Sequence, residues 1–196
     1  MRLNVQKCKL MYICRANRKA EYTIQDYASS EKYKLSTTEN ERDLGIIISN
    51  DLKPCCQVNA AAAKANKILG MFKNSIVTRD ALTWTLLYKS YIRPHLEFAN
   101  SAWFPYRCKD IKAIEKVQRR TTKLIHECKG LSYPDRYKKL RLTTLEERRI
   151  RGDLIQLFKI IEKIDEVKWF FPPITATYGH RSQLRREIVR GCKQRH

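Results

Sequence analysis

Residues 41–72 read ERDLGIIISNDLKPCCQVNAAAAKANKILGMF, and the pattern changes from strand-like to helix-like at Pro54. Before Pro54, residues 43–49 are rich in β-branched isoleucine and run into Asn50-Asp51, which is typical of a strand followed by a turn. After Pro54, the alanines of residues 59–72 give that segment a high helix propensity. The stretch therefore predicts an α+β protein, with strands before Pro54 and helices after it.

The segment before residue 43 contains further runs that predict strands. They cover residues 9–14 and 21–24, and a weaker candidate lies near residues 33–35. Together with residues 43–49 they predict a small antiparallel sheet. Such a sheet makes a poor core by itself, so we expect it to pack on another part of the chain.

The region after Pro54 predicts a mainly α-helical bundle. Thr78 is a suitable N-cap for a helix over residues 80–92, and Pro94 is expected to break or kink that helix. Residues 96–103 continue apolar and aromatic, with small residues that allow close packing.

Two capping boxes predict the starts of the last helices. Ser132-x-x-Asp135 begins a short helix, and Thr144-x-x-Glu147 begins a long one that ends near residue 164. The apolar side of the long helix contains Leu145, Ile150, Leu154, Leu157, Phe158 and Ile161. Pro172-Pro173 is expected to end the helical region.

Asp110 is expected to open an amphipathic helix with one apolar stripe and one basic face. The stripe consists of Ile111, Ile114, Val117, Thr121, Leu124 and Ile125. The basic face consists of Lys112, Lys116, Arg119, Arg120 and Lys123. A second basic zone contains Lys138, Lys139, Arg141, Arg148, Arg149 and Arg151. Acidic residues are few on the first helix, so pairing within it cannot neutralise the face, and both zones are candidate contacts for phosphates.

The net charge indicates an anionic partner. The 196 residues include 40 Lys and Arg against 20 Asp and Glu, a formal charge of +20. Nucleic acid is the commonest reason for such an excess, because cations released from its phosphates drive binding. No apolar run is long enough to span a membrane, and residues 1–4 lack the apolar stretch of a signal peptide. We therefore expect an intracellular protein, nuclear or cytoplasmic and not secreted, with no membrane contact.

The seven cysteines do not predict a metal site. Their number is odd, their spacing is scattered, and no C-x-x-C occurs. Structural zinc sites use closely paired ligands, so we expect reduced thiols and no metal.

Several blocks, in this order, resemble consecutive parts of one enzyme family. They are LNVQKCKLMYI (3–13), ERDLGIIISNDLKP (41–54), KANKILGMF (64–72), LLYKSYIRPHLEFANSAWFPY (86–106), DIKAIEKVQRRTTKLI (110–125) and LSYPDRYKKLRLTTLEERRIRGDLIQLFKII (131–161). They look like the reverse transcriptases of jockey-like and related non-LTR retrotransposons. The blocks come in the family's order and at about its spacing, and the resemblance covers nearly all of residues 3–161.

The resemblance implies an organisation in three parts. Residues 1–52 would be the end of the polymerase palm, residues 53–171 the helical thumb and connection region, and residues 172–196 a flexible basic tail. Leu44 and Gly45 would match the primer grip, a tight hairpin that supports the 3′ end of the growing strand. Lys7 would match a lysine near the incoming nucleotide.

The residues needed for polymerisation are not in this sequence. The family holds two Mg²⁺ ions with carboxylates from a Tyr/Phe-x-Asp-Asp turn and an earlier palm strand. The sequence contains no Asp-Asp pair, and Leu3 already matches the part after that turn. We therefore expect no catalytic residue, no metal or other cofactor, and no enzyme activity in this chain alone. The complete parent would be a Mg-dependent RNA-directed DNA polymerase.

Charge and resemblance together predict a fragment of a transposable element that binds RNA, DNA or an RNA–DNA hybrid by its backbone. Two alternatives remain: a helical module that recruits a protein through exposed apolar surface, and a decayed product with no selected function. The aromatic residues that would serve a protein partner or stack on bases are expected to be mostly core. They are Trp84, Tyr88, Tyr91, Phe98, Trp103, Phe104 and Tyr106.

Overall fold

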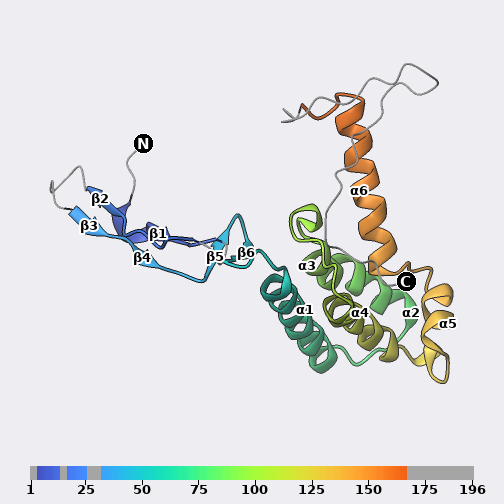
Figure 1. The fold of residues 1–196 in the computed structure, drawn as a ribbon. Helices are drawn as coiled ribbons and strands as arrows, with labels where there is room; N and C mark the ends of the chain where they lie inside the picture. Colours follow the sequence, from blue (N-terminus) through green and yellow to red (C-terminus); the bar gives the residue numbers. More distant parts are fainter. Residues whose placement is uncertain (1–3, 14–16, 26–31, 167–196) are drawn as a thin grey trace, which may run out of the picture. The chain divides into compact units, whose positions relative to one another are not determined.

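The structure, a computed structural model, describes residues 4–13, 17–25 and 32–166 (Figure 1). The chain divides into two compact units, residues 1–150 and residues 151–196. The predicted α+β class is confirmed, with short strands first and helices after them. The predictions for Cys14, Pro172-Pro173 and the basic tail lie outside the described residues.

The strands form three two-stranded pairs instead of one continuous sheet. They are β1 (Lys9–Leu10), β2 (Thr23–Gln25), β3 (Lys32–Lys34), β4 (Ser36–Thr37), β5 (Asn40–Asp43) and β6 (Ile46–Ser49). β1 pairs with β4 in parallel, whereas β2–β3 and β5–β6 are antiparallel. A 3-10 turn, η1 (Val5–Lys7), precedes β1. Most residues of these strands are exposed, so they have no common apolar face on which a larger sheet could form.

The strand predicted over residues 43–49 is confirmed only for residues 46–49, because a tight turn separates them from Asp43. Asp43 pairs with Ile46, which leaves Leu44 and Gly45 as a two-residue loop. Both have positive φ, 45° at Leu44 and 87° at Gly45, as a type I′ turn requires. The isoleucine run indicates a strand correctly, but it continues from β6 only as far back as Ile46.

Two substitutions in this turn are expected to shift stability in opposite directions. Leu44 is 87% exposed at positive φ, so Leu44→Asn relieves backbone strain and stabilises the protein by about 0.5–1 kcal/mol. Gly45→Ala introduces a Cβ only 3.3 Å from Cε1 of Phe98, at a φ that alanine disfavours, and costs about 1–2 kcal/mol. Denaturant unfolding followed by circular dichroism measures both. Equal effects of the two variants would contradict the turn assignment.

The helical part begins with α1 (Cys55–Ser75), which starts directly after Pro54 and is longer than predicted. α2 (Ala81–Leu87) follows, capped by Asp80 and not by Thr78 as predicted. The Asp80 carboxylate accepts a hydrogen bond from the Thr83 N–H at 2.8 Å, which lowers the pKa of that carboxyl group. An ionised aspartate also suits the positive end of a helix dipole.

Pro94 changes the helix geometry before it, as the sequence predicts, although the helix does not end there. Residues Tyr88–Ile92 form a π-helical turn, η2, and α3 (Arg93–Glu97) continues from it. The Arg93 N–H donates to the Tyr88 carbonyl, five residues back. The wider turn accommodates a proline that cannot donate to the carbonyl four residues earlier.

The remaining elements are η3 (Asn100–Ala102), α4 (Cys108–Lys123), η4 (His126–Cys128), α5 (Tyr133–Lys139) and α6 (Leu145–Ile161). α4 begins two residues before the predicted Asp110, and α6 ends before the predicted residue 164. The second capping box is confirmed: the Glu147 N–H donates to Thr144 Oγ1 at 3.1 Å, and the Thr144 N–H donates to the Glu147 carboxylate at 3.2 Å. At α5, Ser132 Oγ accepts from the Asp135 N–H.

The core lies where α1 packs against α4 and α3 (Figure 1). Its largest fully buried side chain is Trp84 of α2, whose indole N–H donates to the Thr78 carbonyl at 2.6 Å. The β5–β6 hairpin joins this core, because Ile46 packs against it and the Ile47 N–H donates to Gln57 Oε1 of α1 at 2.9 Å. One face of α4 therefore packs against the core, and the opposite face is exposed to solvent.

The second unit contains the C-terminal part of α6 and the turn that follows it. The Ile164 and Asp165 N–H groups both donate to the Lys159 carbonyl, and Gln156 Nε2 donates to Asp165 Oδ2 at 2.9 Å. These bonds close the C-terminal end of the helix. Among the residues described, no helix has the length and apolar content needed to cross a membrane.

Candidate nucleic-acid interface

A continuous basic stripe lies along the exposed side of α4. All five predicted residues of this stripe are exposed, and Lys109, which the sequence analysis missed, extends it by one turn. In helical projection the six residues fall within an arc of roughly 100°. We call this set, Lys109, Lys112, Lys116, Arg119, Arg120 and Lys123, the α4 basic stripe. Lys109 was missed because the helix was expected to begin only at Asp110.

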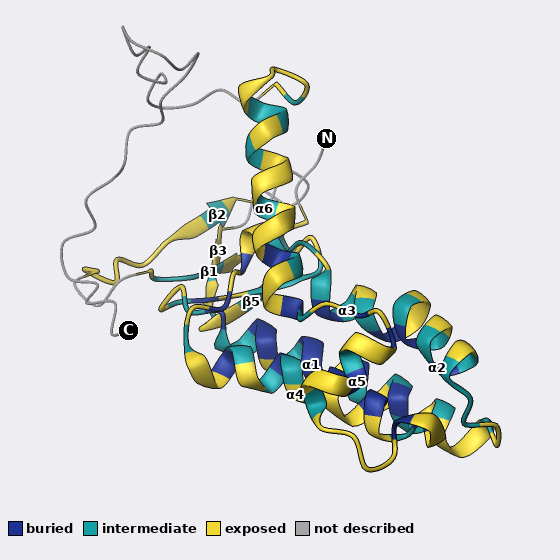
Figure 2. Ribbon diagram, turned by 90° about the vertical axis from the view of Figure 1, so that its right-hand side faces the viewer, coloured by how far each residue is buried: buried dark blue, intermediate teal, exposed yellow. Residues whose placement is uncertain are grey.

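The opposite side of α4 is buried, which orients the stripe toward solvent (Figure 2). Ile114, Val117 and Thr121 lie in the core with almost no exposed surface, as the predicted apolar stripe requires. Ile111 and Leu124 are only half-buried. Basic side chains at three- and four-residue steps stand about 5–6 Å apart on a helix surface.

The two acidic residues of α4 are Asp110 and Glu115, and neither forms an ion pair with the stripe among the described residues. The Glu115 carboxylate accepts one hydrogen bond from the Tyr133 hydroxyl and another, at 3.2 Å, from the Leu145 N–H. Burial and the bond to Glu115 raise the pKa of Tyr133, so its hydroxyl stays protonated and remains a donor. Asp110 is only 4% exposed. Two acids against six basic residues leave the stripe with a large positive charge.

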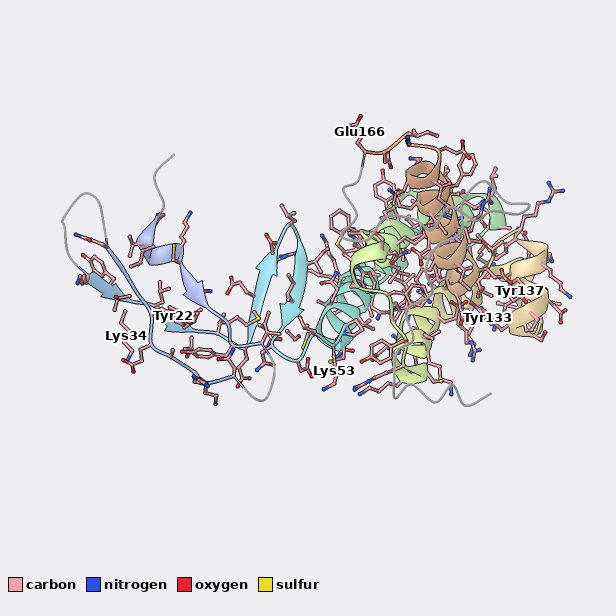
Figure 3. All side chains as sticks on the ribbon, turned by 45° about the horizontal axis from the view of Figure 1, so that its top comes forward. Tyr22, Lys34, Lys53, Tyr133, Tyr137 and Glu166 are labelled. Carbon is pink, nitrogen blue, oxygen red and sulfur yellow. The ribbon has the colours of Figure 1, made fainter. Side chains whose placement is uncertain are left out.

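Four of the stripe residues have no interaction with another described side chain, and two are positioned by neighbours. Among the described residues, no hydrogen bond or ion pair involves the ammonium groups of Lys109, Lys112, Lys116 or Lys123. The Arg120 guanidinium donates to Asn66 Oδ1 of α1 at 3.0 Å. The Arg119 guanidinium lies over the Tyr133 ring, 4.6 Å from its centroid. Tyr133 is in turn packed edge-to-face on Tyr137 of α5 (Figure 3).

The second predicted basic zone is divided by the fold. Lys138, Lys139 and Arg141 are exposed, and the Lys139 ammonium donates to the Glu127 carbonyl. Arg151 is exposed but belongs to the second unit. In the first unit, the exposed basic residues of this zone are therefore Lys138, Lys139 and Arg141.

Arg148 and Arg149 make contacts within the protein, so they are not part of the candidate interface. The Arg148 guanidinium makes two hydrogen bonds to the Glu97 carboxylate, one of them 3.1 Å long, and this pairing raises the pKa of Arg148. Arg149 is only 2% exposed and lies near the Phe104 ring, 6.0 Å from its centroid. A basic run in the sequence does not reveal which of its members face inward.

Arg148→Gln is expected to lower stability and leave nucleic-acid binding nearly unchanged. The substitution removes both bonds to Glu97, which joins α3 to the start of α6, at a cost of roughly 1 kcal/mol because the pair is partly solvated. Thermal melting and a salt titration of binding separate the two effects. A clear loss of nucleic-acid binding at an unchanged melting temperature would instead show that Arg148 contacts the nucleic acid.

The residues matched by resemblance lie in the strand region. Leu44 and Gly45 form the turn of the β5–β6 hairpin, next to Phe98. Lys7 is exposed at the end of η1, where its N–H donates to the Asn4 carbonyl. The hairpin is the local geometry that the resemblance implied; its role, and that of Lys7, stay predictions.

The aromatic segment contributes to both core and surface. Trp84, Tyr88 and Trp103 are buried, as expected, and the Tyr88 hydroxyl donates to Gln118 of α4. The other four of the seven, Tyr91, Phe98, Phe104 and Tyr106, are exposed, so the prediction that this set is mostly core is wrong. Among the described residues, no cluster of His, Cys, Asp and Glu could hold a metal ion.

No protein-family model, no curated protein and no solved structure matches the chain.

Proposed function

We propose that this chain binds nucleic acid through the sugar-phosphate backbone, and that the α4 basic stripe is the main contact. The observation behind this proposal is the separation of charge on α4. Six basic side chains occupy one exposed arc, while of the two acids of the helix Asp110 is buried and Glu115 is half-buried and bonded to Tyr133 and Leu145. A solvated surface with no anionic partner has no need of such a separation.

The chemistry of the stripe favours phosphates over base edges. Lysine supplies a point charge on a flexible stem, and none of the four lysines forms a hydrogen bond or ion pair with another described residue. Sequence readout instead needs groups held in a defined geometry, such as a bidentate arginine or an amide. The two arginines of the stripe are each already in contact with a neighbour. We therefore expect weak dependence on base sequence and strong dependence on salt.

We further propose that the chain derives from the palm end and thumb of a non-LTR reverse transcriptase. The motif blocks and their order support this origin, and the Leu44-Gly45 hairpin agrees with it. Under this proposal the chain contacts the template–primer duplex and does not polymerise. A primer-extension assay with Mg²⁺ and with Mn²⁺ tests the second part: nucleotide incorporation by the purified chain would overturn it.

Fluorescence anisotropy with a labelled duplex tests the binding proposal. If all six stripe residues contact phosphates, the slope of log K against log salt approaches about −5, since each contact contributes about −0.9. Duplexes of unrelated sequence should bind within a few-fold of one another. Binding that is indifferent to salt would instead favour an apolar contact, and absence of binding at low salt would remove the proposal.

A further inference from the structure

A second surface, on α6, is apolar and exposed. Beyond its first turn, α6 is exposed along most of its length (Figure 2). Ile150, Leu154, Phe158 and Ile161 are 48%, 60%, 58% and 36% exposed, and Leu157 is half-buried. A helix that shows several large apolar side chains to water usually has a partner for them.

These residues have the spacing of a coiled-coil seam. Ile150, Leu154, Leu157 and Ile161 are separated by four, three and four residues, so they form one line along the helix. We call these four residues the α6 seam. The seam is also a palindrome, because reading it from either end gives Ile-x₃-Leu-x₂-Leu-x₃-Ile.

We propose that the α6 seam pairs with the same seam of a second copy of this chain, in an antiparallel arrangement. A two-fold axis between residues 155 and 156 sets Ile150 opposite Ile161 of the second copy. The same axis sets Leu154 opposite Leu157. Every seam residue thus meets an apolar residue in one register, as a closed two-fold interface requires.

The residues beside the α6 seam are complementary in charge to the same residues of the second copy when the two-fold axis is applied. Arg151 comes to lie between Phe158 and Glu162 of the second copy, because these two residues occupy the matching heights on the same flank. Arg151 and Glu162 are both exposed. The guanidinium can therefore pair with a carboxylate and cover an aromatic ring, and the symmetry makes each contact twice.

The size of the surface predicts a weak dimer. An aromatic side chain such as Phe158 offers about 150–250 Å², and isoleucine and leucine offer areas near the lower end of that range, so the exposed fractions give roughly 400 Å² per copy. Twice this area is just below what a specific stable interface needs, so we expect a dissociation constant of roughly 10–100 µM. This pairing is independent of the proposed nucleic-acid binding.

Sedimentation equilibrium of the full chain, at high salt and free of nucleic acid, tests the pairing. The wild type should form dimers as its concentration rises to about 200 µM, well above the expected dissociation constant. Leu154→Asp should remain a monomer over this range. Gly152→Asp adds the same charge on the opposite side of α6, where nothing lies within 4 Å of its Cβ, and should dimerise like the wild type. A monomeric wild type, or equal behaviour of the two variants, would overturn the proposal.

A charge exchange tests the antiparallel register and does not depend on how Leu154→Asp folds. Arg151→Glu should weaken dimerisation about five-fold, and so should Glu162→Arg. The double exchange, Arg151→Glu with Glu162→Arg, should restore the wild-type constant. In a parallel pair, Arg151 would instead lie beside Glu146 of the second copy, so rescue by Glu146→Arg and not by Glu162→Arg would overturn the register.

Discussion

Replacing Lys112, Lys116 and Lys123 together by glutamine will reduce the affinity of the chain for duplex nucleic acid roughly 10²- to 10³-fold near 0.1 M salt. Each lysine is exposed on the α4 basic stripe, and none forms an ion pair with another described residue. The loss of three phosphate contacts should also reduce the steepness of the plot of log K against log salt, changing its slope by about 2.7 toward zero. Fluorescence anisotropy over a range of salt concentrations measures both quantities.

The matched control removes the same charge from another surface. Arg18, Lys19 and Lys32 are exposed in the strand region, far from α4 in the sequence, and their replacement by glutamine leaves the net charge equal to that of the stripe variant. This control should lose less than about three-fold in affinity, because unspecific long-range attraction is screened at this salt. If both triple variants lose affinity equally, net charge alone explains binding and the stripe is not a site.

Trp84→Ala will remove most or all of the stability of the first unit. The indole is fully buried at the centre of the helical core, its N–H donates to the Thr78 carbonyl, and the Arg79 guanidinium lies 5.1 Å from its ring centroid. Removing a buried tryptophan costs about 3–5 kcal/mol, a large part of the 5–15 kcal/mol that holds a typical domain. Thermal melting by circular dichroism should show a strongly lowered transition or none.

Two further variants separate the causes of this loss. Leu86 lies on the same helix but is exposed, so Leu86→Ala should change stability by less than about 0.5 kcal/mol. Trp84→Phe keeps an aromatic ring but loses the N–H donor and some volume, so it should cost about 1–2 kcal/mol. An effect of Leu86→Ala as large as that of Trp84→Ala would mean that α2 is not packed as described.

The fold class and most helices could be predicted because local signals decide them. The capping box at Thr144 and Glu147 forms the expected reciprocal bonds, and the three- and four-residue apolar spacing of α4 identifies its buried side. Both depend on residues within one or two turns of the chain. Helix ends were less accurate, since either Thr78 or Asp80 could cap α2 and the choice depends on tertiary packing.

Features that depend on distant partners could not be predicted. β1 pairs in parallel with β4, more than twenty residues away, and no local pattern specifies that choice. At the candidate interface, Arg148 and Arg149 looked like part of a basic surface. Their contacts are with Glu97 and Phe104, which lie about fifty residues earlier in the sequence.

The bond between Gln57 and Ile47 bears on how this chain avoids aggregation. Three consecutive isoleucines in β6 make a short segment of the kind that nucleates cross-β fibrils when its edge is free. The Gln57 side chain occupies the Ile47 N–H, and the Leu52 N–H occupies the Ser49 carbonyl. These two positions of β6 are therefore not available to a strand of another molecule, and local unfolding of α1, which carries Gln57, would open the first of them.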